Sequence, residues 1–311
     1  MVNIFEAKAA NKRKSILVLV FFMAFVAVSV YVMSQAFGLY MGYESGGLGY
    51  AGMALVVSGL MSFGGYYFSD RIVLSISGAK PARREEHFEF YTVAENLALA
   101  AGMPMPKLYL IEDSAPNAFA TGRDMEHAVV CATTGILEKL DRTELEGVVA
   151  HELTHIRNYD IRLMSLVSVL VGTIALLGDW FLRMQWIGGR RGRDSDSGKA
   201  GAIFLVLGIL FAILSPLIAN LIKLAISRRR EFMADAGAVE ITRQPTGLIN
   251  ALRKISGDTE ALEAANKATA HMYIINPFKG KRDRRALSKM ASLFNTHPPL
   301  EERIDALQKM T

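Results

Sequence analysis

The chain has 311 residues, of which 51% are hydrophobic and 21% are charged, with a formal net charge of +5 and a single cysteine, Cys131. This length allows one large domain or two small ones, and a chain this rich in apolar residues is not intrinsically disordered. One cysteine excludes an internal disulfide and any site built from several cysteines, and it is typical of a reducing compartment. The small positive charge, without a basic patch interleaved with aromatic residues, gives no indication of nucleic-acid binding.

Four nearly charge-free apolar runs interrupt the sequence, at residues 15–33, 46–69, 163–178 and 200–222. A helix needs about 20 apolar residues to cross a bilayer, so the first two runs predict a transmembrane hairpin. The first run is too long for a signal peptide, and no cleavage site follows it. The last two runs are predicted to span the membrane or to form an embedded hairpin, with buried core helices as the alternative.

Basic residues predict the orientation of the first hairpin. Lysines and arginines cluster before the first run and after the second, whereas residues 34–48 contain none. Because cytoplasmic loops carry an excess of Lys and Arg, the N-terminus and both ends of this hairpin are expected in the cytoplasm. The loop at 183–199 holds five basic residues. It would lie outside, against this rule, if the last two runs both crossed the membrane.

The expected organisation follows from these runs. Residues 1–70 form a cytoplasmic tail and the first hairpin, and residues 161–222 form the second. The two halves of one soluble domain lie at 71–160 and 223–311, a combined length that suits a single domain.

The soluble halves are predicted to form a small sheet followed by helices, an α+β and mainly helical fold. Strands are expected at 107–112, 117–121 and 127–132, the last two joined as a hairpin. Thr143 and Glu146 have the spacing of a capping box that opens a helix through about residue 158. Further helices are expected at 85–101, 231–242, 246–256, 258–271, 281–294 and 300–309.

The helix predicted from Thr143 contains the sequence His151-Glu-Leu-Thr-His155. Residues four apart share one helix face, so both imidazoles can bind one metal ion. Zinc suits two imidazoles and a carboxylate, and a fourth position left to water makes such a site catalytic. The metal lowers the pKa of that water, and Glu152 is predicted to accept its proton as hydroxide attacks a peptide carbonyl. The alternative is a helix with two surface histidines, which the apolar neighbours of the motif disfavour.

A catalytic zinc site needs a third protein ligand. The remaining histidines are candidates: His87, His127, His271 and His297. Glu231 is another candidate, because Asp235 follows it by one helical turn and can hydrogen-bond a ligand histidine. Its alternative role is to balance the charge of the three arginines that precede it. Spacing alone does not decide whether Glu231 or one of these histidines is the third ligand.

These motifs together resemble the HtpX family of bacterial membrane zinc proteases, which are gluzincins related to the CAAX prenyl proteases. The likeness covers the paired N-terminal spans, the two zinc motifs with an apolar hairpin between them, and the segments 117–122 and 295–299. It implies one zinc ion per chain with Glu231 as the third ligand. It also implies that His297 and Arg303 stabilise the oxyanion. An extended substrate would pair with an edge strand formed by Asn117, Ala118, Phe119, Ala120 and Thr121.

The resemblance implies a multi-pass protein of the bacterial inner membrane, with both termini and the active site in the cytoplasm. Its substrates would be polypeptides, and its role would be stress-related quality control of misfolded membrane proteins. Because His155 and Glu231 must reach one ion, the third and fourth runs must both cross the membrane or both fail to cross. Two alternatives remain: a protease that processes one specific, lipid-modified substrate, and a non-enzymatic scaffold in which zinc is structural.

Overall fold

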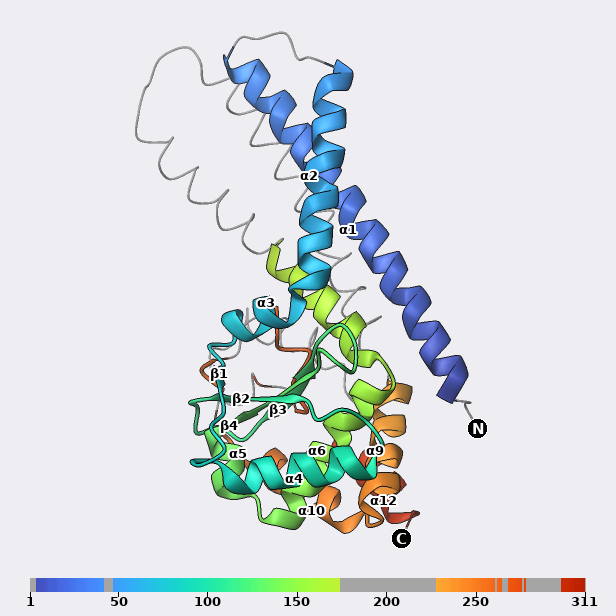
Figure 1. Cartoon of the computed structure of the whole chain (residues 1–311), viewed down its shortest axis with the longest axis vertical. Coiled ribbons are helices and arrows are strands. Elements are labelled where there is room, and N and C mark those ends of the chain that lie inside the picture. Colours follow the sequence, from blue (N-terminus) through green and yellow to red (C-terminus); the bar gives the residue numbers. More distant parts are fainter. Residues whose placement is uncertain are drawn as a thin grey trace.

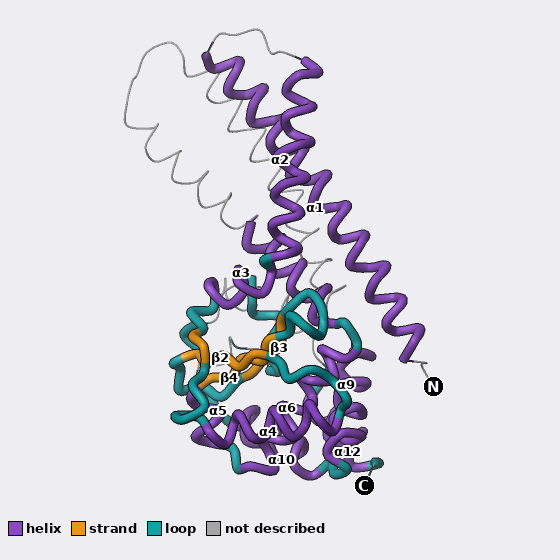
Figure 2. Tube along the Cα trace, viewed as in Figure 1, coloured by secondary structure: helices purple, strands orange, loops and turns teal. Residues whose placement is uncertain are grey.

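The computed structural model describes residues 4–41, 47–173, 228–260, 262–264, 268–275, 277 and 298–310. A long helical hairpin projects from a globular body that holds the sheet and the other labelled helices (Figure 1). The hairpin consists of α1 (Ile4–Met41) and α2 (Gly47–Tyr67). The start of α1 and the end of α2 both lie toward the body (Figure 2).

The hairpin carries large apolar side chains on its outer surface. Leu17 of α1 and Leu60 of α2 are 60% and 68% exposed, and Ile16, Val20 and Phe63 are more than half exposed. Among the residues that the structure describes, no helix combines the length and the apolar character needed to cross a membrane. The membrane spans therefore remain a prediction. The fourth apolar run and the basic loop at 183–199 lie outside the described residues.

The sheet has four strands in the order β1-β2-β4-β3. They are β1 (Lys80–Pro81), β2 (Lys107–Ile111), β3 (Ala118–Thr121) and β4 (Val129–Thr133). The central pair, β2 and β4, is parallel, and the two outer pairs are antiparallel. Strand β3 thus forms one edge of the sheet, and the predicted β3–β4 hairpin is confirmed.

Side chains of the sheet alternate between two buried faces, as the two-residue period of a strand requires. Ala118 and Ala120 of β3 and Val130 of β4 face the main core, whereas Phe119 and Cys131 face the opposite side. Because both faces are covered, the strands are apolar at consecutive positions. The sheet is the middle layer of the body.

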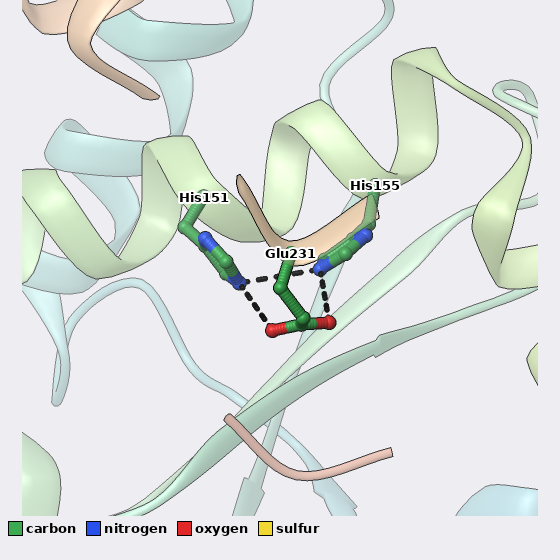
Figure 3. Close-up of side chains that lie close together, drawn as sticks. All are labelled: His151, His155 and Glu231. Atoms are coloured by element: carbon green, nitrogen blue, oxygen red, sulfur yellow. Dashed lines mark hydrogen bonds and ion pairs between the residues drawn. The ribbon is translucent and has the colours of Figure 1, made fainter. Parts of the chain in front are cut away.

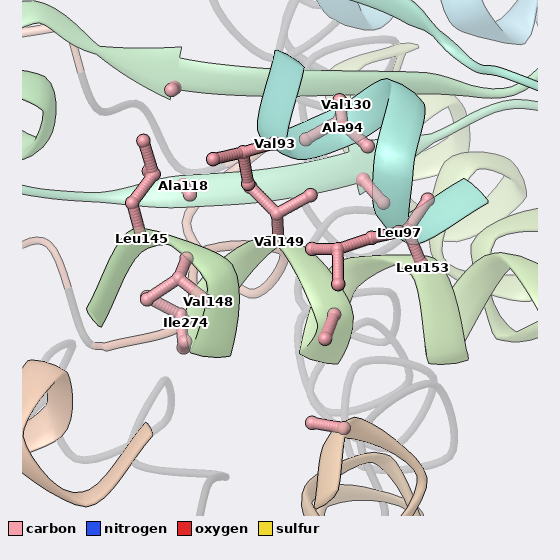
Figure 4. Packing of buried hydrophobic residues seen from close by; sticks show 14 of the residues in the cluster. Val93, Ala94, Leu97, Ala118, Val130, Leu145, Val148, Val149, Leu153 and Ile274 are labelled. Atoms are coloured by element: carbon pink, nitrogen blue, oxygen red, sulfur yellow. The ribbon is translucent and has the colours of Figure 1, made fainter. Parts of the chain in front are cut away.

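Helices lie on the main-core side of the sheet and share its core. They are α4 (Phe88–Ala100), α6 (Arg142–Arg157), α9 (Arg228–Thr242), α10 (Thr246–Gly257) and α12 (Leu300–Gln308). Val149 and Leu153 of α6 pack beside Val93 and Leu97 of α4 in this core (Figure 4). The other face is covered by α3 (Ser69–Ile76), by the helical stretch 160–173 and by Leu262, Met272 and Tyr273. The short helix α5 (Thr134–Lys139) follows β4 directly.

Helix α9 packs very closely on α6 because a glycine stands at the contact. A Cβ atom built on Gly237 would lie 2.4 Å from Cγ2 of Thr154, closer than any real side chain tolerates. Any larger residue would push α9 away from α6, since packed interiors accommodate added volume poorly. Gly237 therefore fixes how far side chains of α9 reach toward α6.

The fold agrees with most of the predicted elements. A mainly helical chain with a small sheet is confirmed, as are strands near 107–112, 117–121 and 127–132. Helices are confirmed near 85–101, 231–242, 246–256 and 300–309, with ends shifted by up to three residues. The helix predicted at 281–294 lies outside the described residues.

The predicted capping box of α6 was wrong by two residues. Asp141 is the N-cap: its carboxylate accepts the N–H of Glu144, whose carboxylate in turn accepts the N–H of Asp141. Thr143 lies inside the first helical turn. Two overlapping patterns, Asp-x-x-Glu and Thr-x-x-Glu, compete here, and Asp is at least as strong an N-cap as Thr.

The helix predicted at 258–271 was also wrong. The described residues of this stretch form turns and irregular loop. The carboxylate of Asp258 accepts the N–H of Glu260 at 2.8 Å and binds Lys139 at 2.6 Å. Such a local bond from an aspartate to the backbone two residues on competes with helix formation.

Candidate metal centre

Helices α6 and α9 bring three metal-binding side chains together (Figure 3). The Nε2 atoms of His151 and His155 are 3.2 Å apart. The carboxylate oxygens of Glu231 lie 3.8 Å from Nε2 of His151 and 3.6 Å from Nε2 of His155. All three side chains are buried, and their ligand atoms lie within 4.8 Å of one another. This is a set of donors around one point, as a single metal ion requires.

Each of the two histidines also contacts a second carboxylate, through Nδ1, the ring nitrogen that faces away from Glu231. Oδ1 of Asp235 lies 3.0 Å from Nδ1 of His151, and Oδ2 of Asp160 lies 3.0 Å from Nδ1 of His155. A carboxylate at Nδ1 favours the tautomer with the proton on that nitrogen, which leaves Nε2 as the metal ligand. Both imidazoles are therefore fixed in orientation, with Nε2 directed toward Glu231.

The donor set fits a divalent cation such as zinc. With Nδ1 protonated on both rings, two Nε2 lone pairs and the Glu231 carboxylate face one another, and they repel unless a positive charge lies between them. Burial lowers the pKa of His155, yet Asp160 and Glu231 outweigh it and raise the pKa to about 9. The carboxylates thus favour a positive charge at this point. Two imidazoles and one carboxylate leave a fourth tetrahedral position for water.

Glu152 lies beside the metal-binding group and is fully buried. The backbone of Ala120 in the edge strand β3 lies next to its carboxylate and favours the charged form, which lowers its pKa. Burial, reinforced by Glu231, raises the pKa of Glu152 to about 7, although His155 and Arg303 oppose the rise. A carboxylate with a pKa near neutrality is suited to accept and return a proton.

Arg303 on α12 is almost completely buried and binds the carboxylate that holds His151. Its Nε and Nη2 donate to the two oxygens of Asp235 at 2.8 and 2.6 Å, a bidentate pair. Its Nη1 lies 3.7 Å from Oε2 of Glu231. The structure thus brings Arg303 to the site, on the same side of His151 as Asp235. His297, the other candidate for the oxyanion, lies outside the described residues.

His87, His127 and His271 lie apart from the metal-binding group. His87 precedes α4, and His127 contacts Asp124 in the β3–β4 loop. His271 lies 3.4 Å from the hydroxyl of Ser168. Among the described residues, the one group of three or more His, Cys, Asp and Glu side chains that could hold a metal is that of His151, His155 and Glu231.

Sequence reasoning did not assign a role to Asp160, which lies just beyond the end of α6. The chain turns there through Tyr159, whose φ of 59° is unusual for a residue other than glycine. This turn carries the Asp160 carboxylate back to His155, where Arg230 also contacts it at 3.6 Å. In the sequence, Asp160 is an acidic residue five positions after His155. A helix brings residues three and four apart onto one face, so helical spacing does not place Asp160 beside the ligand histidines.

Replacing Asp160 by asparagine should weaken zinc binding about 10- to 100-fold, the usual effect of removing a carboxylate that orients a ligand histidine. The measurement is zinc affinity by competition with a chromophoric chelator. Asp124→Asn is the matched control, because Asp124 contacts Nδ1 of His127 in the same way, at 2.6 Å, away from the metal-binding group. Equal zinc affinities for the two variants would show that Asp160 does not support the site.

Comparison with known proteins assigns the chain to a family. The profile of peptidase family M48 matches residues 85–311. The chain belongs to peptidase family M48. It is 42% identical to a protein named Protease HtpX homolog from Caldanaerobacter subterraneus subsp. tengcongensis, over 99% of this chain and 98% of that protein. A protein of the same name from Ligilactobacillus salivarius is 43% identical over 99% of this chain and its full length.

The crystal structure of S. mikatae Ste24p is a more distant neighbour. It shares 17% identity and superposes with a TM-score of 0.41, over 83% of this chain and 64% of the other. The family profile and the HtpX homologues confirm the predicted family and show that this M48 chain is a metalloprotease with polypeptide substrates. Peptidases of this family depend on zinc, and His151, His155 and Glu231 provide a group that could hold it.

Proposed function

We propose that this chain is a membrane-bound zinc endopeptidase, with its active site on the cytoplasmic side, that degrades misfolded or damaged membrane proteins. The observation that carries the proposal is the buried group of His151, His155 and Glu231, with Glu152 beside it and the edge strand β3 alongside. The general-base carboxylate and the strand that would hold a substrate are in direct contact through Ala120. Peptide binding and proton transfer are therefore positioned together.

Zinc held by these residues would bind a water molecule and lower its pKa toward neutrality. Glu152, whose pKa burial raises to about 7, is placed to act as the general base: it would accept a proton from that water and return it to the leaving amine. Asp160 and Asp235 keep the two imidazoles in the ligating tautomer. His297 and Arg303 are proposed to stabilise the negative charge on the substrate carbonyl oxygen, since imidazole and guanidinium groups both donate hydrogen bonds to an oxyanion.

The membrane part of the proposal is supported by the apolar surface of α1 and α2. Contiguous exposed apolar surface indicates contact with a partner or a bilayer. Arg123 of the β3–β4 loop donates to the carbonyl of Tyr67 at 3.0 Å, at the end of α2. The loop that follows the edge strand therefore contacts the base of the hairpin. A polypeptide that emerges from the bilayer there would meet β3, which favours membrane proteins as substrates.

The peptidase activity is tested by incubating the purified full-length chain in detergent with an unfolded membrane protein. Hydrolysis should stop when a chelator removes zinc and should return when stoichiometric zinc is restored. The zinc content measured at each step is the control. Cleavage that continues at the same rate in the metal-free chain would contradict a zinc-dependent mechanism.

The orientation is tested with two single-residue probes, Ala9→Cys on α1 and Leu99→Cys on α4, both at exposed positions. The native Cys131 is fully buried and its pKa is raised by burial, so it should not react. In intact cells an impermeant maleimide should label neither probe, and after permeabilisation it should label both. Labelling of Leu99→Cys in intact cells would place the catalytic body outside.

A further inference from the structure

The outer edge of strand β3 is occupied by the chain itself. Within β3, Ala118 and Ala120 direct their backbone groups away from β4, because the carbonyl of the preceding Asn117 accepts from Thr133 of β4. The carbonyl of Ala118 accepts a hydrogen bond from the backbone N–H of Ile274 at 3.0 Å. An edge strand with such unpaired groups is what an added peptide strand would bind. Ile274 takes one of these positions.

Two side chains of the site also hold this segment by its backbone. Nδ2 of Asn117 donates to the carbonyl of Ile275 at 3.0 Å, and Nη1 of Arg303 points to the carbonyl of Ile274 at 3.5 Å. The oxygen of the Asn117 side chain accepts the N–H of Ala118. Residues 274–275 are thus bound by a strand edge, an amide and a guanidinium, all through groups that any peptide possesses.

The side chains of this segment are anchored in apolar surroundings. The ring of Tyr273 meets Phe119 edge-on, with centroids 5.1 Å apart. Met272, Tyr273 and Ile274 are each at most 2% exposed. Met272 and Tyr273 pack together on one face of the sheet, whereas Ile274 belongs to the main core on the other, so the chain bends across the edge of the sheet here. Both faces of strand β3 are therefore covered, and Ile274 occupies part of its outer edge.

We propose that residues 272–275 act as an internal pseudosubstrate, which lies along the substrate-accepting edge of β3 and keeps the enzyme latent until a substrate displaces it. This inference rests on the proposed function, in which β3 receives an extended peptide. The bound segment also indicates what competes with it: a stretch of large apolar side chains whose backbone can bond to the edge of β3. Such stretches are exposed in unfolded membrane proteins and are buried in folded ones.

The energetic consequence is a reduced apparent affinity for substrate. When only a fraction of molecules has the edge open, the apparent dissociation constant is the intrinsic one divided by that fraction. Loosening the segment should therefore tighten peptide binding without any change at the metal ligands. A single backbone hydrogen bond corresponds to about a five-fold change in such an equilibrium.

The first test measures binding in the full-length, zinc-loaded Glu152→Gln chain, so that no peptide is cleaved. The probe is a fluorescent synthetic peptide with the sequence of residues 268–277. Ile274→Pro removes the N–H that Ala118 accepts, and the probe should bind this variant at least about five-fold more tightly than the Ile274→Val control, which keeps the N–H. Equal affinities for the two variants would overturn the proposal.

A second variant and a variant-free measurement protect the test against misfolding of Ile274→Pro. Tyr273→Ala removes the ring on Phe119, and it should likewise tighten binding relative to Tyr273→Phe. In the chain with its segment unchanged, an excess of the peptide should speed hydrogen exchange of the Ile274 amide, because the segment is displaced. An amide that stays equally protected at saturating peptide would contradict displacement.

The same variants separate this inference from the proposed function. With Glu152 intact, the loosened variants should cleave the peptide with a lower KM than their controls. If binding tightens but no variant cleaves any peptide, the pseudosubstrate stands and the peptidase proposal fails. If the chain cleaves peptides but loosening the segment changes neither binding nor KM, the peptidase stands and the pseudosubstrate fails.

Discussion

Replacing Glu152 by glutamine should reduce peptide hydrolysis by about 10²- to 10⁴-fold while the bound zinc is retained. The loss follows because the amide keeps the size and the contact with β3 but cannot accept a proton, and a positioned general base contributes about this much to a rate. The measurement is the rate of cleavage of an unfolded protein in detergent, together with zinc content. The side chain of Glu152 touches the site without being among its three metal-binding groups.

The matched control for this variant lies on the same helix. Glu146 is on α6 and pairs with Arg142 at 3.1 Å, away from the metal-binding group. Glu146→Gln should leave both the cleavage rate and the zinc content unchanged. If Glu152→Gln and Glu146→Gln cleave equally well at equal zinc content, then Glu152 is not the general base, and the non-enzymatic scaffold becomes the better interpretation.

Replacing Glu231 by alanine should lower zinc affinity by at least about 100-fold, more than the loss of a carboxylate that only orients a ligand. The variant leaves two imidazoles without the negative charge that faces them at 3.6 and 3.8 Å. The measurement is zinc occupancy after dialysis against a weak chelator. Activity should fall in parallel and should recover partly at high zinc, since two ligands remain.

Glu240→Ala is the control for Glu231→Ala, because Glu240 lies on the same helix, α9, and pairs with Arg157 at the surface. It should keep full zinc occupancy. If Glu231→Ala also keeps full occupancy with the fold intact, the third ligand must come from elsewhere in the chain. His297 would then be the first residue to substitute, as it lies outside the described residues.

The local part of the site could be predicted from the sequence because it depends on one helix. The four-residue spacing of His151 and His155 fixes their common face once α6 forms, and the apolar residues around them ensure that it packs. Glu231 could not be chosen from spacing alone. Its approach depends on how α9 meets α6, which in turn depends on Gly237, a contact that no periodicity reveals.

The contacts missed by sequence reasoning are those in which the chain leaves regular structure. Asp160 reaches His155 only because Tyr159 adopts a left-handed conformation, and Asn, Asp and Gly are the residues that normally indicate such a turn. Residues 258–271 have a helical pattern, but Asp258 bonds to the backbone ahead of it. The pairing of Ile274 with Ala118 joins residues 156 positions apart, for which the sequence offers no local signal.

The close contact of Gly237 with Thr154 has a consequence for the integrity of the molecule. The segments on either side of residues 174–227 are held together by the packing of α6 on α9, and the proposed metal site bridges the same two helices. A single cut between residues 174 and 227, including one made by the enzyme itself, would divide the backbone. It would leave the packing of α6 on α9 intact. The two fragments would remain one particle with both halves of the active centre in place, so covalent continuity and catalytic competence are separate properties of this fold.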